Sequence, residues 1–229
     1  MCSCGSKGPM GDPLDEARRL AEQGRFEEAL QKHIWLHDHV LESQPSYYGV
    51  RLSFALADWV DLGRKYPKAL EALKSIRDKK TSRLVAGEGD KRLFHDVRSI
   101  NENLGESKET VELFKQIEAR RPEFASSIYD LADKEMIEAG EYALARRYLG
   151  DPAARLSTAR SHFDSGLVFA RTGQRGDASR QAFETIFTER VVRIITVLDK
   201  TGEHELARRI QSEALKVLDN SGIRNATSN

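Results

Sequence analysis

A short phrase that begins with glycine recurs along the chain and constrains its fold more than any other feature. Gly140-Glu-Tyr-Ala-Leu-Ala-Arg-Arg-Tyr148 returns with few changes as Gly202-Glu-His-Glu-Leu-Ala-Arg-Arg-Ile210, and a looser copy is Gly24-Arg-Phe-Glu-Glu-Ala29. Each copy places an alanine five residues after the glycine, within an amphipathic helical pattern. A glycine–helix unit that recurs every few dozen residues is typical of repeat proteins. We therefore expect an all-α fold of stacked helical hairpins.

Six glycines are candidates for the turns between helices, and they are separated by steps of 29 to 42 residues: Gly24, Gly63, Gly105, Gly140, Gly173 and Gly202. Glycine accepts the left-handed conformation in which one helix ends and the chain turns into the next. The alanine that follows is small enough to let the second helix approach the first closely. We therefore expect Ala145 and Ala207 to be buried between helices.

The repeated units resemble the tetratricopeptide repeat, a helix–turn–helix hairpin of about 34 residues. The likeness is best in segment 165–173, where Gly166 matches the family's small position and Phe169 its aromatic position. It is poorest near Arg98 and Asn101, which match neither position. The resemblance implies a right-handed α-solenoid of about six hairpins. Related helical-hairpin repeats and an ordinary non-repeating helical domain are the alternatives.

The repeat pattern predicts one domain over residues 12–219, a disordered leader over 1–11 and a disordered tail over 220–229. Cys2 and Cys4 fall in the leader, and the sequence does not give them a role. No apolar run approaches the roughly 20 residues that span a bilayer. The N-terminus lacks the apolar core of a signal peptide, so we expect a cytoplasmic location.

Helix boundaries follow from capping residues and breakers. Asp12 followed by Pro13 predicts the start of the first helix. Segment 81–89 contains two glycines and no clear period, which predicts a long loop. No breaker occurs between Gly176 and Gly202, so two helices are expected to meet near Thr188 with almost no connecting loop.

The histidines cluster at His33, His37 and His39. Two histidines four residues apart on a helix can reach one metal ion. A catalytic zinc motif would place glutamate directly after the first histidine, where this chain has Ile34. No nucleophile elbow, phosphate loop or dinucleotide-binding glycine run is present, so we expect no catalysis, no cofactor and no metal. A metal-dependent enzyme or factor built on the three histidines is the alternative.

The net charge is zero, but the charges are unevenly distributed. The segment from Arg64 to Arg83, which we call the basic flank, has only Glu71 and Asp78 against eight basic residues: Arg64, Lys65, Lys68, Lys74, Arg77, Lys79, Lys80 and Arg83. Such a flank suits phosphate or RNA. Because Tyr66 is its only aromatic residue for base stacking, nucleic acid is a secondary alternative.

In the tetratricopeptide family the first helix of each hairpin lines a concave groove. The resemblance places eight polar residues of this chain at groove positions, and these are the predicted partner-binding residues: Arg92, His95, Ser99, Asn103, Asp130, Lys134, Arg160 and Arg171. The sequence thus predicts a protein-interaction module or scaffold that binds a peptide or partner protein in this groove. The partner's identity and the oligomeric state stay open.

Overall fold

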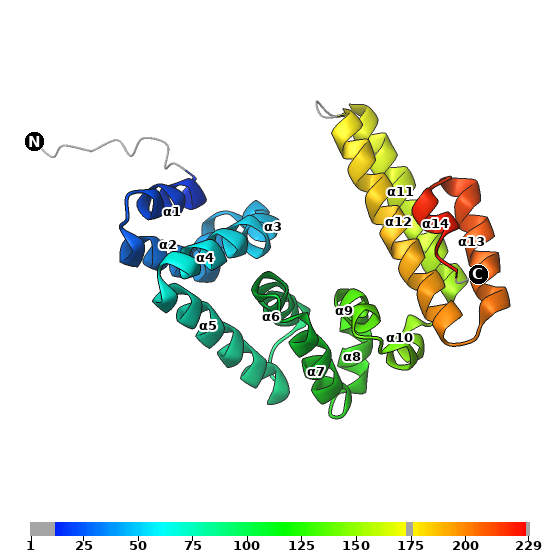
Figure 1. The fold of residues 1–229 in the computed structure, drawn as a ribbon, viewed down its shortest axis with the longest axis horizontal. Coiled ribbons are helices and arrows are strands. Elements are labelled where there is room, and N and C mark those ends of the chain that lie inside the picture. The colour runs from blue at the N-terminus through cyan, green and yellow to red at the C-terminus, as the bar shows by residue number, and fades with distance from the viewer. Residues whose placement is uncertain (1–11, 173–175, 228–229) are drawn as a thin grey trace, which may run out of the picture. The chain divides into compact units, whose positions relative to one another are not determined.

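A computed structural model describes residues 12–172 and 176–227 of the 229-residue chain. These residues contain fourteen α-helices and two short 3₁₀ helices, and they contain no strand, as the helical periodicity predicts (Figure 1). The chain divides into an N-terminal unit, residues 1–125, and a C-terminal unit, residues 126–229. We describe each unit separately, and the single domain over 12–219 stays a prediction.

The N-terminal unit is built from helices that pack on their sequence neighbours. Its α-helices are α1 (Pro13–Glu22), α2 (Phe26–Ser43), α3 (Tyr48–Leu52), α4 (Phe54–Lys65), α5 (Pro67–Val85), α6 (Lys91–Leu104) and α7 (Ser107–Glu118), and α8 (Pro122–Ile128) follows at the boundary between the units. Helix α1 packs on α2, α4 on α5, α5 on α6 and α6 on α7. Helix α4 also contacts α6, and α5 contacts α7.

The core of this unit centres on Trp59 of α4. Its ring is buried among leucines and alanines of neighbouring helices, including Ala69 and Leu73 of α5. The indole Nε1 donates a hydrogen bond of 2.8 Å to the carbonyl oxygen of Ala69, so its one polar group is satisfied. The α4–α5 hairpin is therefore fixed by both apolar burial and a directional bond.

The predicted start of the first helix is confirmed. The carboxylate of Asp12 accepts a 2.8 Å hydrogen bond from the backbone N–H of Leu14, and Pro13 is the first helical residue. The hydroxyl of Tyr47 donates a further bond to the same carboxylate, which connects the N-terminus of α1 to the segment that follows α2.

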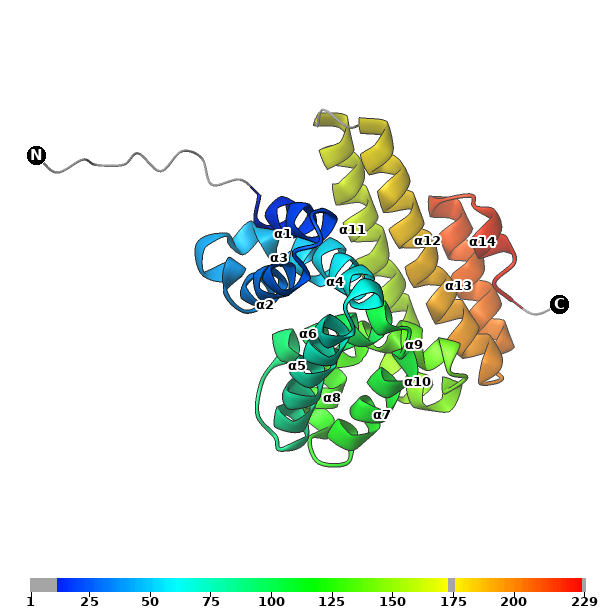
Figure 2. The same cartoon turned by 60° about the vertical axis from the view of Figure 1, so that its left-hand side comes forward.

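The C-terminal unit is dominated by one long hairpin. Its α-helices are α9 (Asp133–Glu138), α10 (Tyr142–Leu149), α11 (Pro152–Thr172), α12 (Gly176–Lys200), α13 (His204–Val217) and α14 (Ser221–Arg224). Helices α11 and α12 lie side by side along their length (Figures 1 and 2). Helices α13 and α14 pack on α12, and α10 contacts α12 as well.

Four of the six predicted turn glycines have the expected left-handed conformation: Gly24, Gly105, Gly140 and Gly202. Gly63 is different, because it lies inside α4 and the chain turns three residues later at Tyr66. A Cβ added at Gly63 would lie 3.0 Å from the Cβ of Leu70, so this glycine serves close packing of α4 on α5. Gly173 lies outside the described residues.

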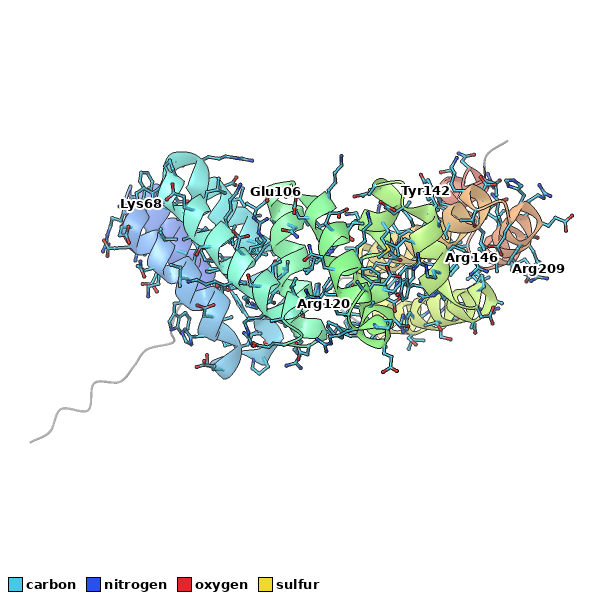
Figure 3. The ribbon with its side chains drawn as sticks, turned by 90° about the horizontal axis from the view of Figure 1, so that it is seen from below. Lys68, Glu106, Arg120, Tyr142, Arg146 and Arg209 are labelled. Atoms are coloured by element: carbon cyan, nitrogen blue, oxygen red, sulfur yellow. The ribbon has the colours of Figure 1, made fainter. Side chains whose placement is uncertain are left out.

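The two best copies of the repeated phrase are connected to each other. Ala145 and Ala207 are fully buried, as expected. Arg146 on α10, which is labelled in Figure 3, belongs to the first copy and forms a two-pronged ion pair with Glu203 of the second copy. The distance from Arg146 Nη2 to Glu203 Oε2 is 3.1 Å. The phrase thus supplies both a helix contact and a link between its copies.

Two predicted boundaries are wrong. Helix α5 continues to Val85, into the segment 81–89 for which the sequence predicts a long loop. Leu84 is buried, which stabilises the last turn of this helix. Helix α12 continues without a break through Thr188. Phe187 and Val191, on either side of that position, are both buried, so packing favours one continuous helix there.

A short helix lies within the expected disordered tail. Asn220 caps α14 by accepting a hydrogen bond from Gly222 N–H, and Ile223 is fully buried. Gln211 on α13 donates a 2.8 Å hydrogen bond to the carbonyl oxygen of Ile223. One buried side chain and one side-chain bond to the backbone therefore order residues that have a weak helical pattern of their own.

Candidate functional site

The predicted groove residues of the N-terminal unit lie on α6, but they do not share one exposed face. Arg92 is exposed and His95 is half-buried, with its Nδ1 2.9 Å from the Tyr48 hydroxyl. Ser99 is only 2% exposed, and the Asn103 amide donates a 2.9 Å bond to the Ser99 carbonyl oxygen. Ser99 is therefore part of the packed interior and not of an exposed binding face. The Asn103 side chain bonds within its own helix.

The other four predicted residues lie in the C-terminal unit. Asp130 is exposed and pairs with Arg155. Lys134 on α9 is half-buried and lies 4.0 Å from a carboxylate oxygen of Glu138. Arg160 and Arg171 are exposed on α11, where Arg160 lies 3.7 Å from Asp164, one helical turn away. Among these four, only Asp130 lines the polar cavity described below.

The three histidines do not come together in the structure. His33 stacks on Trp59 at 5.6 Å and His37 meets the same ring edge-on at 6.1 Å, whereas His39 is exposed and bonds to Glu42. Among the described residues, no three His, Cys, Asp or Glu side chains are grouped so that they could hold a metal ion. Two of the three histidines, His33 and His37, therefore pack in the core against Trp59, and His39 lies on the surface.

Burial also determines the charge state of these histidines. It lowers the pKa of His33 to about 4, with a smaller contribution from the charge of Arg18. Burial, followed by the charges of Lys80 and Arg51, lowers the pKa of His37 to about 3. Both imidazoles are therefore neutral at pH 7.

The basic flank is largely neutralised by acids from outside its own segment. Glu106, which is labelled in Figure 3, accepts bonds from Lys74 and Arg77 at 2.8 and 2.6 Å. Further acids pair with other cations of the flank: Asp61 with Arg64, Asp96 with Lys80, and Glu88 with Arg83. A count of charges within the segment alone therefore overstates its excess of positive charge.

A buried ionic cluster occupies the space between α2, α3, α5 and α6. Asp96 is at its centre and pairs with both Arg51 and Lys80. The side chains of Asp96, Arg51 and Lys80 are 9%, 5% and 17% exposed. The Arg51 guanidinium also donates a 3.1 Å bond to the carbonyl oxygen of His37, and the Lys80 ammonium donates a 3.0 Å bond to the imidazole Nε2 of His37.

The cluster carries one positive charge more than its single carboxylate balances. Burial would raise the pKa of Asp96, but the hydrogen bond from Arg51 and the charge of Lys80 outweigh it and hold that pKa below its ordinary value. Asp96 is therefore ionised while His37 is neutral. Two cations thus face one carboxylate in surroundings that are largely shielded from water.

The sequence contains a signal for one member of this cluster and none for another. Asp96 lies on the apolar stripe of α6 with Leu93, Val97 and Ile100, and an acid on such a stripe is expected to have a buried cationic partner. Arg51 occupies a five-residue helix without a clear period, so its burial could not be anticipated.

A cavity of about 460 Å³ opens over the cluster. Its charged lining includes Arg51, Lys80, Arg92 and Asp96, and Leu93 contributes an apolar wall. Among the eight predicted groove residues, Arg92 lines this cavity beside the buried cluster.

The C-terminal unit has an apolar cavity of about 360 Å³ on the α11–α12 hairpin. Its apolar lining comes from both helices: Phe163, Gly166 and Phe169 on α11, and Phe183, Ile186 and Phe187 on α12. Phe169 is 62% exposed and Ile186 is 43% exposed, so apolar surface extends out of the cavity. The repeat pattern predicts an aromatic residue at Phe169, but it does not predict that this residue is exposed.

A polar cavity of about 520 Å³ adjoins the apolar one and shares Ala159, His162 and Arg190 with it. Arg190 lies 2.5 Å from His162 Nδ1 and has no carboxylate partner among the described residues. The other cations of this cavity are paired, Arg155 with Asp130 and Arg193 with Asp133. We call the two cavities together the α11–α12 groove.

Comparisons of the chain with protein-family models, curated proteins and solved structures find no match in any of the three. In the part of the chain that the structure describes, no helix combines the length and the apolar character needed to cross a membrane.

Proposed function

We propose that this chain is a protein-interaction module built from tetratricopeptide-like helical hairpins, and that it binds a segment of a partner protein in the α11–α12 groove without catalysis. The recurring glycine phrase supports the repeat assignment. So does the N-terminal unit, where α4 contacts α6 and α5 contacts α7, since neighbouring repeats of a helical stack pack in this way.

The exposed apolar lining of the α11–α12 groove carries the proposal. Phe169 is largely exposed at the edge of a cavity lined by further phenylalanines. Val168 beside it is also 61% exposed, although it does not line the cavity. Apolar and aromatic groups that line a pocket are the usual anchor points of protein interfaces, whereas single exposed apolar residues carry no such meaning.

Charge complementarity indicates the kind of partner. Arg190 lies where the apolar and polar cavities meet, and it has no carboxylate partner in the described part of the chain. A segment that inserts an apolar side chain among the phenylalanines would bring an adjacent acidic residue to Arg190. The occupant is therefore an amphipathic segment with an apolar anchor and an acidic neighbour. Arg160 and Arg171, which the family resemblance assigned to binding, lie on the same helix α11.

A random-peptide display library, selected against the intact chain, tests this proposal. We expect the selected peptides to share an aromatic or aliphatic anchor next to Asp or Glu. Their binding should weaken at least tenfold in Phe169→Ser and in Arg190→Ser. The matched control is Phe54→Ser in α4, because Phe54 is 64% exposed and lies in the N-terminal unit.

Three results would contradict the proposal. The first is undiminished binding of the selected peptides to both groove variants. The second is equal weakening by Phe54→Ser. The third is selection of basic peptides, which would invert the charge argument at Arg190. Circular dichroism spectra of each variant would show whether the helices are intact.

A further inference from the structure

We propose that the N-terminal unit binds a small organic acid, holding its carboxylate in the cavity over Asp96, Arg51 and Lys80. This site is independent of the α11–α12 groove and of the proposed partner binding.

The uncompensated charge of the buried cluster is the first argument. Arg51 and Lys80 both pair with the single carboxylate of Asp96. The other charged residues of the cavity lining are Arg83, which pairs with Glu88 outside the lining, and Arg92, Asp38 and Asp90, so the excess of one belongs to the buried cluster and not to the cavity as a whole. A buried charge without a counter-charge destabilises a fold, so one bound anion would relieve this cost.

The hydrogen bonding of Arg51 is the second and independent argument. Its Nε is buried and has no hydrogen-bond partner. Buried polar atoms without a partner are uncommon in proteins, and each one requires an explanation such as an absent ligand or water. Both terminal nitrogens of the guanidinium bond to Asp96, so one N–H group of Arg51 is left without an acceptor inside the protein.

Two cations can meet a ligand directly. Lys80 is partly exposed and lines the cavity, and it already bonds to Asp96 and His37. Arg92 is exposed, and its guanidinium has no ion-pair partner among the described residues. By contrast, Asp90 accepts 3.0 Å bonds from the backbone N–H groups of Arg92 and Leu93, so its carboxylate caps α6.

The shape of the cavity favours an organic acid over an inorganic anion. Its volume of about 460 Å³ exceeds the needs of a single small ion and lies in the usual range for organic ligands. Leu41 and Leu93 provide apolar walls for a carbon skeleton. The excess of one positive charge suits a carboxylate better than a doubly charged phosphate monoester.

Three probes of similar shape test the site in the full chain: benzoate, the neutral benzamide, and phenyl phosphate. We expect benzoate to bind with a millimolar or lower dissociation constant in calorimetry, and to shift the amide resonances of Gly89 and Leu93. Benzamide should bind at least tenfold more weakly, and phenyl phosphate should bind more weakly than benzoate.

Lys80→Gln removes the excess charge and leaves the Arg51–Asp96 pair in place, so it should weaken benzoate binding at least tenfold while the helical spectrum is kept. Lys79→Gln is the matched control, since Lys79 is exposed on the same helix and does not line this cavity. Equal binding of benzoate and benzamide would overturn the proposal. So would unchanged benzoate binding in Lys80→Gln, or binding of phenyl phosphate tighter than that of benzoate.

Discussion

At the residue scale, the two buried histidines make the stability of the N-terminal unit depend on pH. The folded-state pKa values of His33 and His37, about 4 and about 3, lie below the unfolded value of about 6.5. Between these values the unfolded chain binds more protons than the folded chain. The contribution of both residues is therefore present above about pH 6.5 and is lost as the pH falls below it.

We expect the free energy of unfolding to fall by about 1.4 kcal/mol per pH unit for each of these histidines, at pH values well below 6.5 and above the folded pKa values. Urea denaturation between pH 7.5 and 4.5 measures this slope. His37→Gln should reduce the slope, whereas His39→Gln should leave it nearly unchanged, because His39 is exposed. A slope that does not respond to His37→Gln would show that His37 is not buried as a neutral group.

At the element scale, the alanine five residues after the repeat glycine is buried in one helical hairpin and exposed in another. Ala207 is fully buried, whereas Ala178, five residues after Gly173, is exposed on α12. Ala207→Leu should therefore cost about 1–3 kcal/mol through overpacking. Ala178→Leu should change the stability by less than about 0.5 kcal/mol. Thermal denaturation of the two variants checks the pair, and equal melting temperatures would contradict the packing role of Ala207.

Gly166 fixes how closely α11 and α12 approach. A Cβ added there would lie 2.3 to 2.7 Å from atoms of the Phe183 ring. Gly166→Ala should therefore destabilise the hairpin by about 1–3 kcal/mol and alter the apolar cavity. Gly49→Ala in α3 is the control, since nothing lies within 4 Å of the added Cβ, and a helical alanine should be neutral or stabilising there. Chemical denaturation decides between these outcomes, and an unchanged midpoint for Gly166→Ala would show that Phe183 gives way freely.

Elements with a local signal were predictable from the sequence, and those that depend on distant contacts were not. The turns at Gly24, Gly105, Gly140 and Gly202 follow from the conformational freedom of glycine. The last turn of α5 depends on the burial of Leu84, which no local pattern reveals. The α11–α12 groove has no local signal either, since the family pattern specifies an aromatic residue at Phe169 but not its 62% exposure.

At the scale of the whole molecule, the histidines are divided unequally between the units. Four of the six lie in the N-terminal unit, and the two of the C-terminal unit, His162 and His204, are exposed. Acidification should therefore destabilise the N-terminal unit first. Amide hydrogen exchange at pH 5 and pH 7, corrected for intrinsic rates, should show a larger loss of protection in α4 than in α12. Equal loss in both helices would show that the two units open as one cooperative body.

The ion pair between Arg146 and Glu203 has a consequence for how such a chain can grow by duplication. Its arginine comes six residues after the glycine of one copy, and its glutamate comes one residue after the glycine of the next. Each of the two best copies, at Gly140 and Gly202, therefore encodes both residues of an ion pair between successive copies, whereas the looser copy at Gly24 encodes neither. A tandem duplication of the gene segment would supply the new junction with an ion pair at once, without a compensating mutation. Arg208, at the position equivalent to Arg146, is exposed in the last copy and is the half that a further copy would meet.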